Sequence, residues 1–176
     1  MVEVKTNEQE GLTKMDKQEV EKLFDQCMKD ATDEDLKVIH QLLGGVISKK
    51  QQNYDSYISA ILNMNKLELD NEYKITIPIN KLSDNSLGIV HGGITATVLD
   101  TAMGTLANLV LPEGYGAVTS NLAIHYIAPG KGEILETTAK IIHKGSKTIV
   151  MEGSAFCDGG KKIAHCTGTF FIIKKG

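Results

Sequence analysis

The sequence predicts an α+β domain in which one curved antiparallel sheet wraps a single long helix, preceded by a helical N-terminal extension. Between Asn85 and Val110 a polar turn leads through His-Gly-Gly into an apolar run whose only charge is Asp100. Apolar or small residues fall on nearly every side of a 3.6-residue period there, which is typical of a buried helix. Two strand-like runs precede this helix and four follow it. Short connections between strands favour antiparallel pairing, so a single sheet is expected to wrap the helix.

Two amphipathic helices are expected near the N-terminus. Apolar residues recur at spacings of three and four over residues 16–28, which predicts the first helix. The second is expected to begin at Thr32, because Thr32 and Asp35 resemble a capping box in which Asp replaces the usual Glu. Gly44-Gly45 is expected to end it. Acidic residues outnumber lysines in this region, which argues against a DNA-binding helix pair.

The strands are predicted from a change to a period of two. From about residue 61 apolar and polar residues alternate on both sides of an Asp70-Asn71 turn, which predicts a hairpin with one buried face. Pro78 indicates either an edge strand or the end of pairing. Pro112 and Gly114 follow the long helix and are expected to close it. Four more strands are expected at residues 117–127, 133–143, 148–158 and 163–173.

Composition excludes several classes of protein. The 176 residues carry a net charge of −3, and all 19 basic residues are lysines. Without arginine the bidentate contacts typical of base and phosphate recognition are missing, so nucleic acid is not an expected partner. The N-terminus lacks the apolar segment of a signal peptide, and no apolar run approaches the length of a membrane span. We therefore expect a cytoplasmic protein that does not enter a membrane.

Three cysteines, an odd number, fit a reducing compartment better than a disulfide scaffold. A two-residue turn at Gly159-Gly160 would place Cys157 opposite Lys162 and Cys166 opposite Gly153, so these cysteines are not expected to pair. No CxxC or HxxxH spacing suggests a metal site. The three cysteines, Cys27, Cys157 and Cys166, are expected to be small core residues.

The long helix contains two features that together suggest chemistry. An unpaired carboxylate in a buried helix loses on the order of several kcal/mol to desolvation, so Asp100 must be partnered, face a polar cleft or stay protonated. Gly92 and Gly93 lack side chains where the helix starts, so free backbone N–H groups can approach an incoming oxygen with the helix dipole behind them. The ordinary alternatives are a glycine pair that only breaks the chain and a solvent-facing acid.

The same residues resemble the signature of the hot-dog-fold thioesterases, specifically the PaaI-like acyl-CoA thioesterase branch. The signature is carried by Asn85-x-x-Gly88-x-Val90-His91-Gly92-Gly93, followed by Asp100 seven residues after Gly93. Further matches are Val118-Thr119-Ser120-Asn121-Leu122, Tyr126, Pro129, His143-Lys144-Gly145 and residues 164–170. The resemblance covers roughly residues 60 to 174. It implies a hot-dog thioesterase domain at residues 56–176, after a helical extension at residues 1–55.

The resemblance implies roles for five residues. Asp100 matches the catalytic carboxylate, which acts as a general base toward water or as a nucleophile. Gly92 matches the backbone N–H donor that polarises the thioester carbonyl, and Asn85 matches a side chain that assists it. His91 matches a histidine that orients this corner, and Thr119 matches a residue that positions the attacking water.

The implied reaction is hydrolysis of an acyl-CoA thioester to a carboxylic acid and free CoA, with no metal and no cofactor beyond the substrate. Gly93 and the turn Lys144, Gly145 and Ser146 resemble the segments that bind the substrate and its nucleotide. The alternative interpretation of Lys144–Ser146 is an ordinary solvated hairpin turn. A non-catalytic acyl-CoA sensor is a second interpretation. A hydroxyacyl-thioester dehydratase is a third, which the spacing of Asp100 after Gly92 fits less well.

Helix geometry adds an expectation about assembly. Gly92 and Asp100 are eight residues apart, which is about 12 Å along one helix. A base and an oxyanion donor must both lie near one thioester carbon. Two chains with antiparallel helices would place Gly92 of one beside Asp100 of the other, so we expect an obligate homodimer with two shared sites. Further pairing into a homotetramer, the acyl group and the role of the N-terminal helices stay open.

Overall fold

The structure is a computed structural model that describes residues 16–70 and 72–175. The chain divides into two compact units, Met1–Ile39 and His40–Gly176. The division falls within the second helix, α2, which spans Asp33–Lys50. It therefore lies earlier in the chain than residue 55, where the sequence places the end of the helical extension. No helix in the described part of the chain is long and apolar enough to cross a membrane.

The first helix, α1, spans Lys17–Met28 and confirms the first predicted helix. The Asp16 side chain caps it by accepting a hydrogen bond of 3.1 Å from the backbone N–H two residues on. At the start of α2 the Thr32 hydroxyl accepts from the Asp35 N–H at 3.2 Å, and the Asp35 carboxylate accepts from the Thr32 N–H at 3.0 Å. The predicted capping box is thus confirmed. The Thr32 hydroxyl also donates to the Asp35 carboxylate at 2.6 Å, and this hydrogen bond, followed by the one from the Thr32 N–H, lowers the pKa of Asp35.

The predicted end of α2 at Gly44-Gly45 is wrong, because the helix continues to Lys50. Gly45 is buried, and a Cβ atom at this position would lie only 2.8 Å from the Cα of Ile61. Ile61 belongs to the short helix α3, Tyr57–Ile61. The glycine is therefore needed for close contact between the backbones of α2 and α3, not for a break in the helix.

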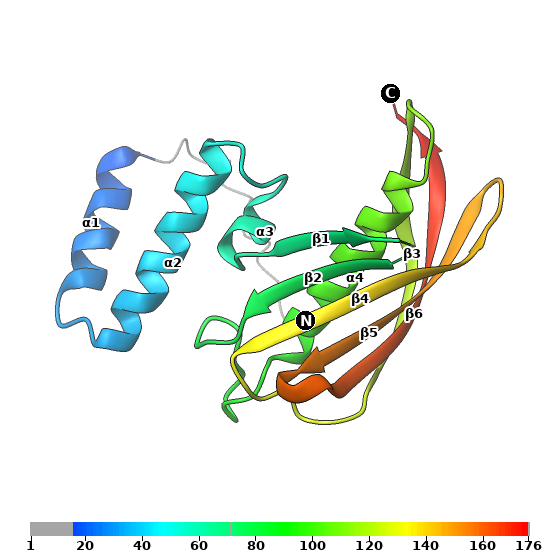
Figure 1. Cartoon of the computed structure of the whole chain (residues 1–176). Coiled ribbons are helices and arrows are strands. Elements are labelled where there is room, and N and C mark those ends of the chain that lie inside the picture. The colour runs from blue at the N-terminus through cyan, green and yellow to red at the C-terminus, as the bar shows by residue number, and fades with distance from the viewer. Residues whose placement is uncertain (1–15, 71, 176) are drawn as a thin grey trace, which may run out of the picture. The chain divides into compact units, whose positions relative to one another are not determined.

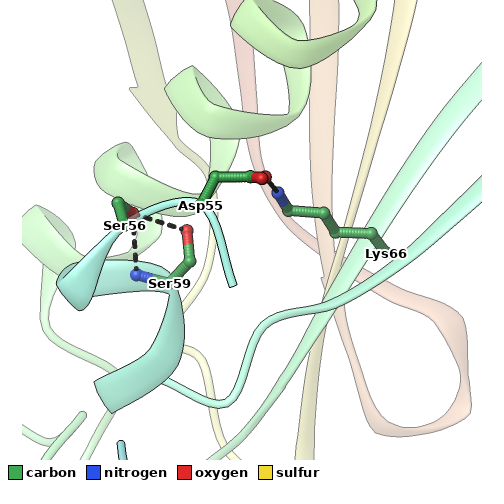
Figure 2. Close-up of polar contacts among 4 residues, drawn as sticks. All are labelled: Asp55, Ser56, Ser59 and Lys66. Atoms are coloured by element: carbon green, nitrogen blue, oxygen red, sulfur yellow. Dashed lines mark hydrogen bonds and ion pairs between the residues drawn. The ribbon is translucent and has the colours of Figure 1, made fainter. Parts of the chain in front are cut away.

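The start of α3 is fixed by its own polar residues, as Figure 2 shows. Ser56 is the N-cap, and its hydroxyl accepts a hydrogen bond from the Ser59 N–H at 3.2 Å. The two serine hydroxyls also lie 3.0 Å apart. The ammonium of Lys66 on the following strand pairs with the Asp55 carboxylate, which lowers the pKa of Asp55. These contacts connect the helix to the first strand.

The second unit contains one antiparallel sheet of six strands that curves around α4, Gly92–Leu109 (Figure 1). The strands are β1 Asn65–Leu69, β2 Glu72–Pro78, β3 Tyr115–Tyr126, β4 Ile134–Lys144, β5 Thr148–Cys157 and β6 Lys161–Lys174. The predicted α+β fold is confirmed, including the pairing of β1 and β2 in a hairpin. The predicted buried face is found on β2 only, because β1 has no buried residue. Asn71 of the predicted hairpin turn lies outside the described residues.

The core lies between the inner face of the sheet and α4. Alternate residues of β2, namely Tyr73, Ile75 and Ile77, are buried, as the period of two predicts. They belong to the same hydrophobic cluster as Leu99 and Met103 of α4, which are completely buried. The contacts of α4 extend to β2, β3, β4, β5 and β6. Pro78 is the last residue of β2, an interior strand, so it ends the pairing and does not mark an edge.

One pairing differs from the simple succession of neighbours that short loops suggest. The order of strands is β1-β2-β4-β5-β6-β3, so β3 pairs with β6 and not with β4. The connection at residues 127–133 crosses the end of the sheet. Backbone hydrogen bonds hold it there, from Val90 N–H to Gly130 O at 3.0 Å and from Ile79 N–H to Glu133 O at 2.7 Å. Pairing along nearly the whole of β6 stabilises β3 at the edge.

The turn between β5 and β6 also differs from the prediction. Asp158–Gly160 forms a three-residue 3₁₀ turn in place of a two-residue turn, and the register shifts between Ala155 and Phe156. As a result Cys157 lies opposite Lys161, whereas the expected pairing with Lys162 does not occur. The expected pairing of Cys166 with Gly153 does occur.

Two of the three cysteines lie in the core. Cys157 and Cys166 are buried, as predicted, but Cys27 is exposed on α1, a helix without buried residues. Amphipathic spacing identifies the apolar face of α1, but it does not show whether that face is covered. Burial raises the pKa of Cys166 to about 11. This thiol therefore stays protonated near neutral pH and is a poor nucleophile.

Candidate active site

The N-terminus of α4 presents backbone N–H groups beside a capping histidine. His91 is the N-cap, and its Nδ1 accepts a hydrogen bond of 2.9 Å from the Gly93 N–H. Nδ1 must therefore be unprotonated, which leaves the ring proton on Nε2. Gly92 is the first residue of the helix, so its N–H has no partner within the helix. The positive end of the helix dipole favours an anionic oxygen at this N–H.

Tyr126, the last residue of β3, lies against Gly92. Its Oη donates a hydrogen bond of 2.7 Å to the Gly92 carbonyl oxygen. A Cβ atom at residue 92 would lie 3.3 Å from Cζ of the tyrosine ring, so glycine leaves room for this close approach. Tyr126 is part of the family resemblance, but no role was predicted for it. The contact joins residues 34 positions apart, and no local pattern predicts it.

Asn85 occupies the turn before α4. Its side-chain oxygen accepts hydrogen bonds from the Leu87 N–H at 2.8 Å and the Ile89 N–H at 3.4 Å. Gly88 in this turn has φ of 65°, a conformation that glycine adopts without strain. Because the carbonyl oxygen of Asn85 closes the turn, its NH₂ group is the part that can donate to a ligand.

A cavity of about 430 Å³ lies at this corner of the fold. Asn85, Gly92, Thr95 and Tyr126 line it, together with apolar residues of the 89–90 turn and the 127–130 connection. An apolar wall with a few convergent polar groups is typical of a small-molecule site. The structure therefore brings Asn85 and Gly92 of the predicted site together.

Asp100 lies about two turns further along α4 and is half-buried. The Thr119 hydroxyl donates a hydrogen bond of 2.8 Å to Oδ1 of Asp100. Of the three possibilities for this carboxylate, the structure thus confirms that it is partnered. Thr119 stands beside a bulge in β3, where the register shifts between Thr119 and Asn121. Bulges redirect side chains and are frequent next to active sites.

The predicted site residues form two groups within one chain. Asn85 and Gly92 line the cavity, whereas Asp100 and Thr119 are not among its described lining residues. Eight residues of helix separate Gly92 from Asp100, which corresponds to about 12 Å. One chain therefore holds a donor group, Asn85 and Gly92, and an acid group, Asp100 and Thr119, at separate positions.

The turn predicted to bind the nucleotide of CoA lies at the other end of α4. The Lys144 ammonium donates to the carbonyl of Val110, the C-cap of α4, where a cation also interacts favourably with the helix dipole. An 18-residue helix is about 27 Å long, so Lys144 is far from Gly92 of the same chain. Gly145 donates its N–H to Thr148 O at 2.9 Å, as in an ordinary hairpin turn, and Ser146 is exposed. A role of this turn in CoA binding stays a prediction.

Comparison with known proteins identifies the same stretch of the chain. Residues 87–164 match the model of the thioesterase superfamily. Mouse acyl-coenzyme A thioesterase 13 is 39% identical over 62 residues, which are 35% of this chain and 44% of the mouse protein. A Halobacterium salinarum protein named as a candidate esterase is 34% identical over 88 residues, which are 47% of this chain and 58% of that protein. The chain thus spans about half the length of these curated relatives.

Solved structures show the likeness over most of the fold. The crystal structure of the BH2602 protein from Bacillus halodurans with CoA is 39% identical, with a TM-score of 0.79. The match covers 84% of this chain and 98% of that protein. It therefore extends to residues before position 56. The Escherichia coli PaaI protein shares the fold at 22% identity and a TM-score of 0.63, covering 77% of this chain and 96% of its own. The chain therefore belongs to the thioesterase superfamily and has the hot-dog fold.

Proposed function

We propose that this chain is an acyl-CoA thioesterase, which converts an acyl-CoA and water into a carboxylic acid and free CoA. The observation that carries the proposal is the carboxylate of Asp100, held by the Thr119 hydroxyl at 2.8 Å on the helix whose N-terminus offers the Gly92 N–H. Membership of the thioesterase superfamily supports the reaction. The CoA in the crystal structure of the 39% identical Bacillus halodurans protein supports the class of substrate.

Asp100 is proposed as the group that initiates attack on the thioester carbon. Thr119 engages Oδ1, so Oδ2 is available to remove a proton from water, and a positioned base contributes roughly 10²–10⁴ in rate. Direct attack by Oδ2, giving an anhydride that water then hydrolyses, is the alternative role. On either route the carbon–sulfur bond breaks and the CoA thiolate takes up a proton. Cys166 is not a candidate nucleophile, because burial raises its pKa to about 11.

The Gly92 N–H and the Asn85 amide are proposed as the donors to the thioester oxygen. Both line the same cavity, and the N-terminal end of the helix dipole favours the negative charge that develops on this oxygen. One preorganised donor contributes on the order of 10²–10³ in rate because it acts on charge that appears only in the transition state. Gly93 is a weaker candidate than Gly92, since its N–H is already bonded to His91.

A homodimer with shared sites is proposed because the two groups lie apart on one chain. The edge strand β3 carries Thr119 and contains no lysine or acidic residue, so its free backbone groups can pair with a second copy. Antiparallel pairing would bring the donor group of one chain toward the acid group of the other. Each dimer would then hold two equivalent sites.

The test is release of free thiol from short, medium, long and aromatic acyl-CoAs by the wild type, Asp100→Asn and Glu152→Gln. Glu152 is the matched control. It is also half-buried, but it lies on the face of β5 opposite to Met151 and Gly153, which face the core. We expect turnover by the wild type and Glu152→Gln, and a loss of at least about 10² in kcat for Asp100→Asn. Equal turnover by Asp100→Asn, or tight acyl-CoA binding without turnover by the wild type, would contradict the proposal. The second outcome would favour an acyl-CoA sensor.

A further inference from the structure

The peptide unit between Gly92 and Gly93 is held at both of its ends. Its carbonyl oxygen accepts the hydrogen bond from Tyr126 Oη at 2.7 Å. Its N–H donates to Nδ1 of His91 at 2.9 Å. A peptide unit is planar, so two hydrogen bonds from opposite edges fix the direction in which the whole plane faces.

Hydrogen bonds to the peptide units on both sides of Gly92 restrain where its own N–H points. The Gly92 N–H belongs to the preceding peptide unit, and the two units rotate against each other only about the bonds to Cα of Gly92. Glycine permits more of these rotations than any other residue. An N–H at a glycine on the first turn of a helix is therefore poorly preorganised unless other groups hold its surroundings. The unit that carries the Gly92 N–H is held by the helix hydrogen bond from the Thr95 N–H to the His91 carbonyl at 3.1 Å. The unit that follows is held by Tyr126 and by the His91 ring.

We infer that Tyr126 is a positioning residue of the oxyanion site, which clamps the Gly92–Gly93 peptide together with His91 and so aims the Gly92 N–H at the substrate oxygen. The inference rests on the proposed function. Tyr126 also lines the cavity beside Asn85, so its ring forms part of the wall that the thioester would meet. The tight approach of the ring to Gly92 gives the clamp a steric component, because a Cβ there would lie 3.3 Å from Cζ.

The chemistry of the phenol fits this role and does not fit a role as an acid. Its proton is committed to a backbone carbonyl, which cannot pass it on to a leaving group. Burial, followed by the neighbouring Cys166, raises the pKa of Tyr126 above its ordinary value of 10.0. The group therefore stays a neutral donor throughout the neutral pH range, and the clamp does not depend on pH there.

The experiment compares Tyr126→Phe with Tyr115→Phe in the full-length protein. Both changes remove one hydroxyl from β3, but the Tyr115 hydroxyl, at the opposite end of the strand, has no hydrogen bond to a described residue. For Tyr126→Phe we expect kcat to fall about five- to tenfold, as for loss of one neutral hydrogen bond. KM should stay within about twofold, because the direction of the Gly92 N–H affects the stability of the transition state more than that of the ground state. Tyr115→Phe should match the wild type in both constants.

Melting temperatures separate positioning from folding. We expect Tyr126→Phe to melt within about 3 °C of the wild type, since the ring and its packing remain. An unchanged kcat, a rise in KM alone, or a loss of kcat that follows an equal loss of folded protein would each overturn the inference. Absence of turnover by the wild type would instead overturn the proposed function. The two failures are therefore distinguishable.

Discussion

At the scale of single residues, the hydrogen bond from Thr119 to Asp100 sets the orientation of the carboxylate. The hydroxyl occupies Oδ1, which fixes the rotation of the carboxylate and directs Oδ2 away from the bond. The bulge beside Thr119 explains why an exposed residue of an edge strand reaches the helix at this point. Asp100 therefore depends on a side chain from a distant part of the chain for its orientation.

Replacing Thr119 tests this dependence. Thr119→Val keeps the shape of the side chain but removes the donor, so we expect kcat to fall roughly tenfold with little change in stability. Thr119→Ser keeps the hydroxyl and should retain activity within a few-fold of the wild type. Steady-state kinetics of both variants on the best acyl-CoA of the panel provide the measurement. Equal activity of the Val and Ser variants would show that the hydroxyl has no part in catalysis.

The residue scale is also where prediction from sequence reached its limit. Asp100 could be singled out because a lone charge in a buried helix demands an explanation. The hydrogen bond of Tyr126 to Gly92 could not be predicted, because it depends on where β3 ends relative to the start of α4. The contact of Lys144 with the C-terminus of α4 could not be predicted either, because it depends on where β4 ends relative to that helix. Local patterns identify residue types that suit a task, whereas their partners depend on tertiary structure.

At the scale of elements, Gly44-Gly45 shows how a correct local rule gives a wrong boundary. Glycine does weaken a helix, by roughly 1 kcal/mol relative to alanine, and it commonly ends one. Here the contact of Gly45 with the backbone of Ile61 outweighs that preference. The predicted strands, by contrast, are all six present, and the periodicity is clearest in β2 and β5, where core and solvent alternate residue by residue.

The two glycines are expected to respond to alanine in opposite directions. Gly45→Ala should lower the free energy of unfolding by about 1–3 kcal/mol, because its Cβ would lie 2.8 Å from the Cα of Ile61. Gly44→Ala is the matched control, since no atom lies within 4 Å of its added Cβ. It should raise the free energy of unfolding by about 0.5–1 kcal/mol through helix propensity. Urea denaturation measures both, and a stabilised Gly45→Ala would refute close packing of α2 on α3.

The order of strands has a direct bearing on the site. Because β3 pairs with β6 and not with β4, it lies at the edge of the sheet with one row of backbone groups free. Thr119 and Tyr126 are both on this strand, so it contacts the acid group and the donor group alike. Short loops alone suggest neighbouring pairs, and the crossing at residues 127–133 could not be predicted from loop length.

At the scale of the whole molecule, the separation of Gly92 from Asp100 is the central feature. About 12 Å of helix lies between the proposed oxyanion donor, Gly92, and the proposed catalytic carboxylate, Asp100, of one chain, whereas a single thioester carbon needs both. We expect a dimer in solution, with each site built from Asp100 of one chain and Gly92 of the other. This expectation rests on the length of helix between the two residues and not on the family resemblance.

The shared site can be tested by combining two inactive variants, one of which must lack only the Gly92 N–H. Gly92→Pro deletes the N–H at the first position of α4, where proline is well tolerated. The residue before it, His91, has φ of −62° and ψ of 131°, which suits a residue that precedes proline. Gly92→Ala is the control, because it adds a similar Cβ near Tyr126 but keeps the N–H.

The most direct test is to refold Asp100→Asn and Gly92→Pro together and to measure thioesterase activity against each variant alone. Half of randomly formed dimers would be mixed, and each mixed dimer would contain one intact site, so we predict recovery of about one quarter of wild-type activity. Asp100→Asn mixed with Gly92→Ala should recover at least as much, since the alanine chain keeps its donor. Folded mixed dimers with no activity above that of the separate variants would contradict the shared site.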